Sequence, residues 1–274
     1  MIHLGLIGYP LVHSLSPKIH TAALKACGLQ GDYSLFPIRP DDKQGLKNLL
    51  DRVRAGEITG LNVTIPHKQN VIEWMNELTP TAQAIGAVNT IYLLNNKLIG
   101  DNTDAPGFLS DLNQFIGSRE LGIENQKSAL VLGAGGSARA IVYALANDGW
   151  SITIASRRLQ PAQELSSRFK NTNAIELNFQ TFQPANFQLI VNTTPLGMTP
   201  DMDQSPLPEN LSLPSNTLIY DLVYNPRETK LVKDAQSQGL SATTGLGMLI
   251  EQAALAFEVW TGHNPSREIM RLSV

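Results

Sequence analysis

The sequence predicts an α/β protein made of two domains, and three observations lead to this expectation. Strand-like and helix-like segments alternate along most of the chain, which is typical of parallel sheets covered by helices. A glycine-rich stretch joins one strand to one helix near the middle of the chain. A length of 274 residues allows two ordinary domains, each with its own core. We therefore expect an N-terminal α/β domain with a mixed sheet, a second α/β domain, and a cleft between them.

The N-terminal part alternates strands and helices and then forms a hairpin. Pro17 follows Ser16 at the start of the first helix, where the N–H that proline lacks would have no helical partner. Asn95 and Asn96 separate two apolar runs, and asparagine tolerates the positive φ of a tight hairpin turn. The expected elements are strands near 2–8, 33–38 and 60–65, helices near 16–27 and 41–55, and a hairpin over 87–100.

The C-terminal part starts with a helix after residue 100 that leads to the second domain. A strand and a helix share residues 128–146, and further strands are expected near 151–155, 188–191 and 217–220. The stretch 243–260 has few charges and is apolar around most of its circumference, so we expect a buried helix packed on the first domain. The predicted domains are residues 1–104 with 246–274, and residues 105–245.

Composition and charge argue against several classes of protein. Hydrophobic residues make up 42% of the chain, charged residues 16%, and the formal net charge is −3. Lys and Arg are scattered rather than clustered, so nucleic acid is not an expected partner. No apolar run approaches the ~18 residues of a membrane span. The single cysteine, Cys27, excludes an intramolecular disulfide and favours the cytoplasm. The five histidines lack metal-ligand spacing, so no metal is expected.

The glycine-rich stretch predicts a dinucleotide site. The apolar run 129–132 meets Gly133-Ala134-Gly135-Gly136-Ser137-Ala138, and a helical pattern follows. In this context Gly133 permits the tight turn, Gly135 lets the backbone approach a pyrophosphate, and Ala138 lets the helix pack close to the sheet. The helix N-terminus adds free N–H groups and a partial positive charge. The second domain is therefore expected to be Rossmann-like.

The end of the next strand favours NADP over NAD. An NAD-binding fold places an acidic residue about 20 residues after the glycines, to bind the ribose 2′-hydroxyl. Here the strand near 151–155 ends in Ser156-Arg157-Arg158, and no carboxylate lies between Ser151 and Gln163. Guanidinium groups bind phosphate in bidentate fashion, so this triplet suits a 2′-phosphate. Two solvated arginines in a surface loop are the alternative.

Four polar clusters in the N-terminal part indicate a small, oxygen-rich substrate. Each lies where a strand or loop ends, and together they offer hydroxyls, amides, one ammonium and one carboxylate. The clusters are Ser14-Leu15-Ser16-Pro17, Asn62-Val63-Thr64-Ile65-Pro66-His67-Lys68, Ala87-Val88-Asn89-Thr90 and Gly100-Asp101-Asn102-Thr103-Asp104. By itself, Lys68 has the simpler interpretation of a solvated lysine after a strand that Pro66 ends.

These motifs resemble the shikimate dehydrogenase family, and the resemblance runs nearly end to end. It rests on S-L-S-P (14–17), N-V-T-I-P-H-K (62–68), G-A-V-N-T (86–90), G-D-N-T-D (100–104), G-A-G-G-S-A (133–138), N-T-T-P-L-G-M (192–198), D-L-V-Y-N-P (221–226) and G-L-G-M-L-I-E-Q-A (245–253). The family implies an NADP-dependent oxidoreductase of aromatic amino-acid (chorismate) biosynthesis, which reversibly reduces 3-dehydroshikimate to shikimate. Relatives often read Asn-Arg-Thr where this chain has Ser156-Arg157-Arg158.

The resemblance also implies roles for individual residues. Lys68 and Asp104 would be the catalytic pair, because a lysine ammonium can stabilise the growing alkoxide and donate a proton to it. The residues implied in substrate binding are Ser14, Ser16, Asn62, Thr64, Asn89 and Gln252. Those implied in coenzyme binding are Gly133, Ala134, Gly135, Gly136, Ser137, Ser156, Arg157, Arg158, Asn192, Thr193, Leu222, Tyr224, Gly245 and Met248.

Several of these residues also have a purely structural interpretation. Ser16 and Asp104 are each placed to cap a helix. In the same way, Gln252 is explained as an exposed helix position and Tyr224 as ordinary packing. The turn at Pro195 is explained as a purely structural turn.

Two other functions remain open from the sequence. One is a dehydrogenase with the same chemistry that accepts quinate or uses NAD. The other is a non-catalytic metabolite sensor on the same scaffold, since fold alone does not fix function. The expected partner is a small molecule, and the expected state is a monomer or homodimer.

Overall fold

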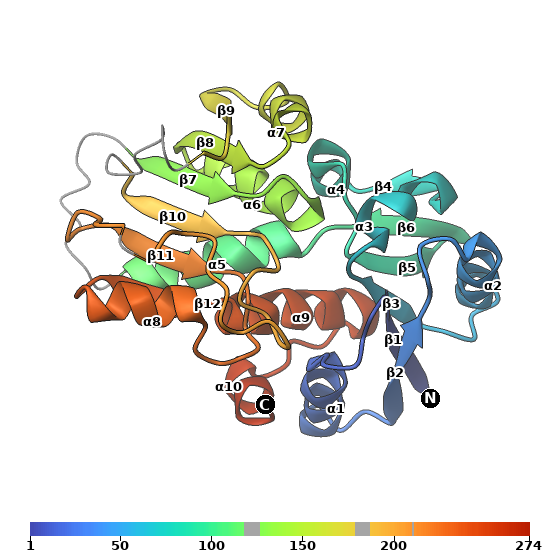
Figure 1. The fold of residues 1–274 in the computed structure, drawn as a ribbon. Coiled ribbons are helices and arrows are strands. Elements are labelled where there is room, and N and C mark those ends of the chain that lie inside the picture. The colour runs from blue at the N-terminus through green and yellow to red at the C-terminus, as the bar shows by residue number, and fades with distance from the viewer. Residues whose placement is uncertain (118–126, 179–186, 210) are drawn as a thin grey trace. The chain divides into compact units, whose positions relative to one another are not determined.

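The computed structural model describes residues 1–117, 127–178, 187–209 and 211–274 (Figure 1). The chain forms two compact units, residues 1–107 with 249–274, and residues 108–248. The division falls inside the helices α5 (Asp104–Ile116) and α9 (Leu246–Thr261), whereas the sequence predicts it at the first residues of these helices.

The first unit is built on a six-stranded mixed sheet. In the sheet order β2-β1-β3-β5-β6-β4, its strands are Gly31–Pro37, Ile2–Gly8, Gly60–Val63, Thr90–Leu94, Lys97–Asp101 and Glu77–Leu78. β1 is parallel to β2 and β3, whereas β5 is antiparallel to β3 and β6. The carboxyl ends of β1, β3 and β6 therefore lie at the same edge of the sheet as the amino end of β5.

Helices cover both faces of this sheet because successive strand residues point to opposite sides. Leu4 and Leu6 of β1 pack with Ile19 of α1 (Ser16–Ala26) and Phe257 of α9. Ile7, on the other face, packs in a second core with residues of α2 (Lys43–Arg54). Smaller helices complete the unit, namely α3 (His67–Asn70), the 3₁₀ helix η1 (Ile72–Trp74), α4 (Pro80–Ile85) and α10 (Arg267–Leu272).

The second unit is built on a six-stranded sheet whose neighbouring strands are all parallel. In the sheet order β12-β11-β10-β7-β8-β9, the strands are Ser241–Thr244, Leu218–Asp221, Leu189–Asn192, Ser128–Leu132, Ser151–Ser156 and Thr172–Glu176. The chain starts at β7 and builds outward in both directions, so the strand order reverses beside β7 (Figure 1). Ligands of open parallel sheets bind at such a reversal, beyond the carboxyl ends of the strands.

Alternate residues of β11 show which helices cover the faces of the second sheet. Ile219 packs with Leu231 of α8 (Lys230–Ser237). Tyr220 points to the opposite face, where its ring lies edge-on to Phe108 of α5. The other helices of the unit are α6 (Gly136–Asn147) and α7 (Leu159–Ser166).

The structure confirms most of the predicted elements and corrects one. The hairpin turns at Asn95 and Asn96, which have φ of 50° and 61°. The apolar C-terminal helix packs in the first core, as expected. Its predicted start at 243 is wrong, because 241–244 form β12 and the helix begins at Leu246. Threonines at 243 and 244 favour a strand because β-branched side chains fit a pleated surface.

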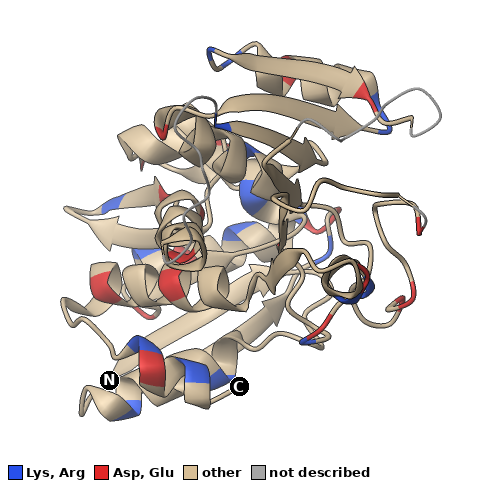
Figure 2. Ribbon diagram, turned by 90° about the vertical axis from the view of Figure 1, so that its left-hand side faces the viewer, with Lys and Arg blue, Asp and Glu red and all other residues tan. Residues whose placement is uncertain are grey.

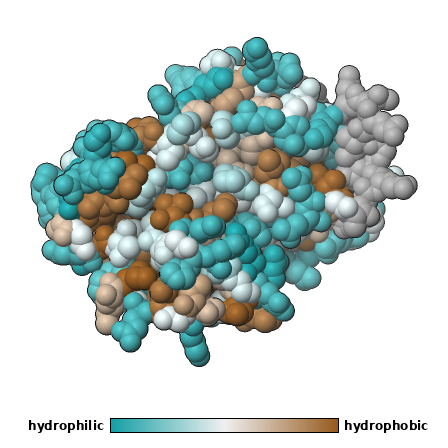
Figure 3. All heavy atoms as spheres, turned by 180° about the vertical axis from the view of Figure 1, so that it is seen from behind, coloured by the Kyte–Doolittle hydropathy of each residue, from teal (hydrophilic) through white to brown (hydrophobic). Residues whose placement is uncertain are grey.

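Figure 2 shows Lys and Arg interspersed with Asp and Glu along the ribbon. On the face shown in Figure 3, hydrophobic residues form separate patches among hydrophilic ones. Within the described ranges, no helix is both long enough and apolar enough to span a bilayer.

Candidate active site

The topology of the first sheet gathers the four polar clusters at one edge. The cluster of Ser14 and Ser16 follows β1, and that of Thr64 and Lys68 follows β3. The cluster of Asn89 precedes β5, and the one that ends at Asp104 follows β6. Because β5 is antiparallel to β3 and β6, all four meet at the same edge.

A buried ion pair lies at the centre of this edge. The ammonium of Lys68 is 2.5 Å from Oδ2 of Asp104, and the two residues are 9% and 4% exposed. Lys68 is held by α3, whose position is fixed by a hydrogen bond from the backbone N–H of Val88 to the Lys68 carbonyl. The interpretation of Lys68 as a solvated surface lysine is therefore wrong.

Asn89 connects the ion pair to its surroundings. Its Nδ2 donates to Oδ1 of Asp104 at 2.9 Å and lies 3.3 Å from Oε1 of Gln252. Its Oδ1 accepts from the backbone N–H of Thr103 at 2.7 Å. The amide of Asn89 thus fixes the carboxylate of Asp104 and brings Gln252 of α9 to the same cluster.

Gln252 is buried, 9% exposed, so its interpretation as an exposed helix position is wrong. Asn62 is also buried, and its amide donates to the carbonyl of Asn89 at 3.3 Å while its Oδ1 accepts from the Tyr33 hydroxyl at 2.8 Å. Asn62 therefore supports Asn89 from β3. No local pattern indicated Tyr33, because its contact depends on how β2 and β3 flank β1.

Ser14 and Thr64, which follow β1 and β3, are half-buried, and Ser16 is buried. Oγ of Ser14 accepts from the backbone N–H of Ser16 at 3.3 Å. A Cβ on Gly8 would collide with the Thr64 methyl, so Thr64 packs directly against the end of β1. The hydroxyls of Ser14, Ser16 and Thr64 make no hydrogen bond to the Lys68–Asp104 pair in the described structure.

The helix-capping interpretations of Ser16 and Asp104 are wrong. Ser16 is the first residue of α1, so it does not occupy the N-cap position, which belongs to Leu15. At α5 the cap is Asn102, whose Oδ1 accepts from the backbone N–H groups of Asp104 and Ala105 at 3.1 and 3.3 Å. The Asp104 carboxylate is thereby left for Lys68 and Asn89.

The second sheet presents its candidate residues at the carboxyl ends of β7, β8, β10, β11 and β12. Gly133 has φ of 110° and turns the chain from β7 into α6. A Cβ on Gly135 would meet no protein atom within 4 Å, so open space lies in front of the α6 N-terminus. The first N–H groups of a helix have no helical acceptor and favour an anion. Gly133, Ala134, Gly135, Gly136 and Ser137 therefore fit the pyrophosphate of a dinucleotide.

The loop after β10 is tied to this turn. The backbone N–H and the hydroxyl of Thr193 both donate to the carbonyl of Leu132, at 2.9 and 2.7 Å. Asn192 is completely buried, and its amide donates to Oδ1 of Asp221 at 2.8 Å. Sequence reasoning missed Asp221, although it opens the D-L-V-Y-N-P motif. Burial raises the pKa of its carboxyl to about 6, against the opposing effect of its hydrogen bonds.

The loop after β11 and the start of α9 lie next to each other. A Cβ on Gly245 would collide with the Leu222 backbone, so only glycine allows this approach. Met248, on the first turn of α9, is 7% exposed. Tyr224 is half-buried, and burial raises the pKa of its hydroxyl. Leu222 and Gly245 therefore belong to one neighbourhood at this edge of the second sheet.

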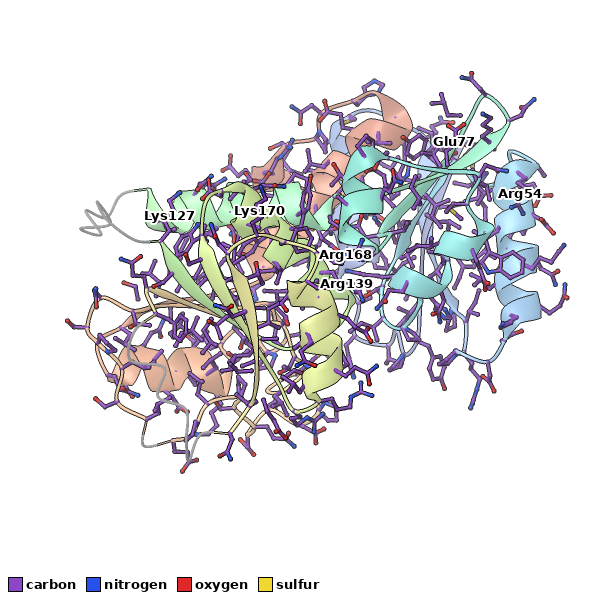
Figure 4. All side chains as sticks on the ribbon, turned by 90° about the horizontal axis from the view of Figure 1, so that it is seen from above. Arg54, Glu77, Lys127, Arg139, Arg168 and Lys170 are labelled. Atoms are coloured by element: carbon purple, nitrogen blue, oxygen red, sulfur yellow. The ribbon has the colours of Figure 1, made fainter. Side chains whose placement is uncertain are left out.

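Positive charge surrounds α6 and the end of β8. Arg157 and Arg158 follow Ser156 and are exposed. Figure 4 shows Arg139 of α6 beside Arg168, which follows α7. Burial and then the charge of Arg168 lower the pKa of Arg139, whose buried Nε has no hydrogen-bond partner among the described residues. Two like charges held close together favour an anionic ligand in this region.

A glycine turn at the strand reversal of a parallel sheet, on the same chain as a buried lysine–aspartate pair, defines a dinucleotide-dependent dehydrogenase. Models of three known domains match the chain: the shikimate dehydrogenase substrate binding domain over 6–91, the shikimate/quinate 5-dehydrogenase domain over 116–223, and the shikimate 5'-dehydrogenase C-terminal domain over 245–271. Relatives named shikimate dehydrogenase (NADP(+)) include those of Methanococcus maripaludis strain C6, 37% identical, and Shouchella clausii, 39% identical. These alignments cover 99% and 97% of this chain, and 95% of each relative. The chain belongs to the shikimate dehydrogenase family.

Solved structures show the same similarity. A shikimate dehydrogenase in complex with NADP+ is 37% identical with a TM-score of 0.90, over 100% of this chain and 94% of the other. The enzyme of Thermus thermophilus, in complex with NADP(H) and shikimate, is 37% identical with a TM-score of 0.88, over 100% and 98%. A quinate dehydrogenase of Corynebacterium glutamicum in complex with NAD is 30% identical with a TM-score of 0.88, over 99% and 98%.

Proposed function

We propose that the protein catalyses the reversible NADPH-dependent reduction of 3-dehydroshikimate to shikimate. The observation that carries this proposal is the buried Lys68–Asp104 pair, at the sheet edge where the substrate-binding candidates converge. A non-catalytic sensor would need no such pair, because its ligand undergoes no proton transfer. NADPH supplies the hydride.

Lys68 is the proposed proton donor. As the carbonyl carbon is reduced, negative charge grows on its oxygen, and an ammonium beside it stabilises that charge and delivers a proton. In the reverse direction the neutral amine accepts the hydroxyl proton. Asp104 orients the ammonium through its Oδ2, while its Oδ1 is held by Asn89.

The remaining polar side chains of this edge are proposed to hold the substrate. Ser14 and Ser16 would bind its carboxylate, because the loop that carries them follows β1 and presents two hydroxyls. Thr64, Asn89 and Gln252 would bind its ring hydroxyls. Asn62 contributes by supporting Asn89.

The second unit is proposed to hold NADP through the carboxyl ends of its strands. The N-terminus of α6 with its glycine turn would bind the pyrophosphate. Ser156, Arg157 and Arg158 would bind the adenosine 2′-phosphate, and Asn192, Thr193, Leu222, Tyr224, Gly245 and Met248 would line the nicotinamide side. The positive charge of Arg139 and Arg168 supports an anionic coenzyme in this unit.

A steady-state assay tests the function directly. Purified protein is mixed with shikimate or quinate and with NADP or NAD, and coenzyme reduction is followed by absorbance. We expect the highest kcat/KM with shikimate and NADP. Faster turnover of quinate, or equal use of NAD, would replace the proposal by the quinate dehydrogenase alternative. Absence of reduction with all four pairs would favour a sensor.

We also propose that the protein works in the cytoplasm as a monomer or homodimer. Its one cysteine, which is free, is consistent with a reducing compartment. Sedimentation of the purified protein would distinguish the two oligomeric states, and fractionation of its host cells would test the location.

A further inference from the structure

A continuous chain of hydrogen bonds runs along the carboxyl ends of β7, β10 and β11 and reaches α8. Thr193 donates to Leu132 at the end of β7. Its neighbour Asn192 ends β10 and donates through Nδ2 to Asp221, which ends β11. Asp221 in turn accepts from the hydroxyl of Thr229 at 2.6 Å, and Thr229 caps α8. These hydrogen bonds anchor the loops after β10 and β11, which are proposed to hold the coenzyme.

Asp221 is the one charged member of this chain, and each of its contacts is an accepted hydrogen bond. Oδ1 accepts from Asn192 and from the backbone N–H of Val223 at 3.0 Å, and Oδ2 accepts from Thr229. The side chain is 0% exposed, and no ion pair to it exists among the described residues. Because a carboxylate can only accept, it forces each of these three neighbours to donate.

This forced direction passes on to the loop after β10. With Nδ2 of Asn192 turned toward Asp221, its Oδ1 faces Thr194 and accepts from the backbone N–H and the hydroxyl, at 2.9 and 2.7 Å. Nδ2 also reaches the carbonyl of Leu196 at 3.5 Å. The amide of Asn192 therefore closes the turn 192–196 in one orientation only. A flipped amide would place its NH₂ against the N–H of Thr194.

We propose that Asp221 is a positioning residue of the coenzyme site, whose ionised carboxylate orients Asn192, the N–H of Val223 and Thr229 and so holds the loops 192–196 and 222–224 in their binding shape. This inference rests on the proposed function, because it assigns these loops to NADP. Asp221 itself is completely buried, so its proposed effect on the coenzyme is exerted through these neighbours.

The substitution Asp221→Asn would reverse the direction of at least one bond. The introduced amide would bring two N–H hydrogens and keep one acceptor oxygen, while its three neighbours still need an acceptor. Either Thr229 loses its acceptor or the amide of Asn192 meets another NH₂ group. A buried donor without an acceptor is costly, and the loops would relax to recover it.

The charge state of Asp221 also predicts a pH dependence of coenzyme binding. Its pKa of about 6 means that the carboxyl takes up a proton as pH falls through 6, and it then carries a hydrogen where it must accept one. Neither β10 nor β12 carries a titratable side chain, and residues 108–248 contain no histidine. The titratable groups that the helices of this unit bring to either face of β11 are Lys230, Lys233 and Asp234 of α8 and Asp111 of α5. The loop between β11 and α8 adds the half-buried Tyr224 and the exposed Arg227 and Glu228.

No hydrogen bond or ion pair among the described residues joins Asp221 to any of these helix groups. Lys230 pairs with Asp234 at 3.1 Å. Asp111 accepts from the hydroxyl of Tyr220, which points to the face of the sheet opposite α8. Titration near pH 6 in this neighbourhood is therefore assigned to Asp221.

The test compares Asp221→Asn with wild type by titrating each with NADPH and following coenzyme fluorescence, without substrate. We expect the dissociation constant of NADPH to rise about tenfold to a hundredfold at pH 7.5, as the loss of a buried acceptor predicts. The KM for shikimate should stay within twofold. Asp234→Asn, the same chemical change on α8, is the matched control and should bind as wild type. A dissociation constant for Asp221→Asn within twofold of wild type would overturn the proposal.

The pH profile separates positioning from a merely structural role. The 2′-phosphate of the coenzyme also titrates near pH 6, so the informative quantity is the ratio of variant to wild-type dissociation constants. We expect this ratio to fall toward one as pH is lowered from 7.5 to 5.5, because wild type then loses its carboxylate too. A ratio independent of pH would contradict the assignment.

A second pair of variants keeps the test decisive if Asp221→Asn does not fold. Thr229→Val removes a donor to the carboxylate, so the pH at which NADPH binding weakens should move upward, whereas Thr229→Ser should restore the wild-type value. An unchanged midpoint in folded Thr229→Val would overturn the proposal. The titration measures coenzyme binding without turnover, so it does not depend on the proposed reaction. If wild type binds NADPH but does not oxidise shikimate with NADP, the proposed function is refuted while the test of Asp221 remains valid.

Discussion

The two units treat a buried charge in opposite ways at the sheet edges that carry their candidate sites. In the first unit, the ammonium of Lys68 and the carboxylate of Asp104 lie 2.5 Å apart and neutralise each other. In the second unit, Asp221 is fully buried and is surrounded by neutral donors only, without a cation among the described residues.

This difference indicates what each carboxylate does. A pair of opposite charges in a small buried space holds a proton donor ready where charge will develop on a substrate, which is useful for catalysis. A carboxylate held by neutral donors has no cationic partner that could give a proton to a substrate. It does fix the direction of each hydrogen bond that it accepts. We therefore assign catalysis to the first arrangement and positioning to the second.

Removal of the ammonium is the largest test of this contrast. Lys68→Ala should lower kcat with shikimate and NADP by about 10²–10⁴-fold, the usual contribution of a positioned acid–base group. The dissociation constant of NADPH should be unchanged, because the coenzyme residues belong to the other unit. Steady-state kinetics with a separate coenzyme titration measure both. Turnover within twofold of wild type would remove Lys68 from its catalytic role.

Loss of one partner should affect the stability of the first unit strongly. Asp104→Asn leaves the buried ammonium of Lys68 without a counter-charge, which costs about 3 kcal/mol of unfolding free energy when a buried pair is broken. Urea unfolding of the variant and of wild type measures this loss. Asp51→Asn breaks two exposed pairs, with Lys47 and Arg54, and should leave stability essentially unchanged. Equal stability of Asp104→Asn and wild type would show that the Lys68–Asp104 pair is solvated.

The buried carboxylate of the second unit should behave in the opposite way. The folded pKa of Asp221 is raised from 3.8 to about 6, so its charge opposes folding: the favourable contribution is present below pH 4 and is lost as pH rises through 6. At about 1.4 kcal/mol per pH unit, the charge costs up to about 3 kcal/mol at neutral pH. Asp221→Asn removes this pH-dependent cost but also leaves a buried donor without an acceptor, so the prediction concerns how the stability difference changes with pH. As pH falls from 7.5 to 4, the unfolding free energy of wild type should gain up to about 3 kcal/mol relative to that of Asp221→Asn, measured by urea unfolding at each pH. A stability difference independent of pH would contradict the raised pKa of Asp221.

Local sequence patterns were sufficient for the fold class and for many of the elements. The glycine motif with its strand and helix predicted the position of the α6 N-terminus. The four polar clusters all lie at one edge of the first sheet. Such features could be predicted because a turn, a strand end or a helix start depends on residues that are close in sequence.

Long-range contacts explain what the sequence could not supply. Asn89 and Gln252 meet across 163 positions, and that contact depends on how α9 packs on the first sheet. The cap of α5 required a choice between Asn102 and Asp104, both of which suit a helix start. The importance of Asp221 depends on its complete burial, which no spacing of residues reveals.

The smallest expected effect concerns the exposed cations of the second unit. Arg157 lies at the surface, so Arg157→Ala should leave stability and the KM for shikimate unchanged. If its guanidinium binds the 2′-phosphate, the KM for NADP should rise about tenfold, which corresponds to the loss of one charge-assisted hydrogen bond. The KM for NAD, which lacks this phosphate, should not change. Lys170→Ala removes another exposed cation of the same unit and is the control for a general charge effect. If both coenzymes weaken equally in Arg157→Ala, the arginine acts through long-range charge or loop shape, and phosphate recognition must be sought at Arg158 or at Arg139.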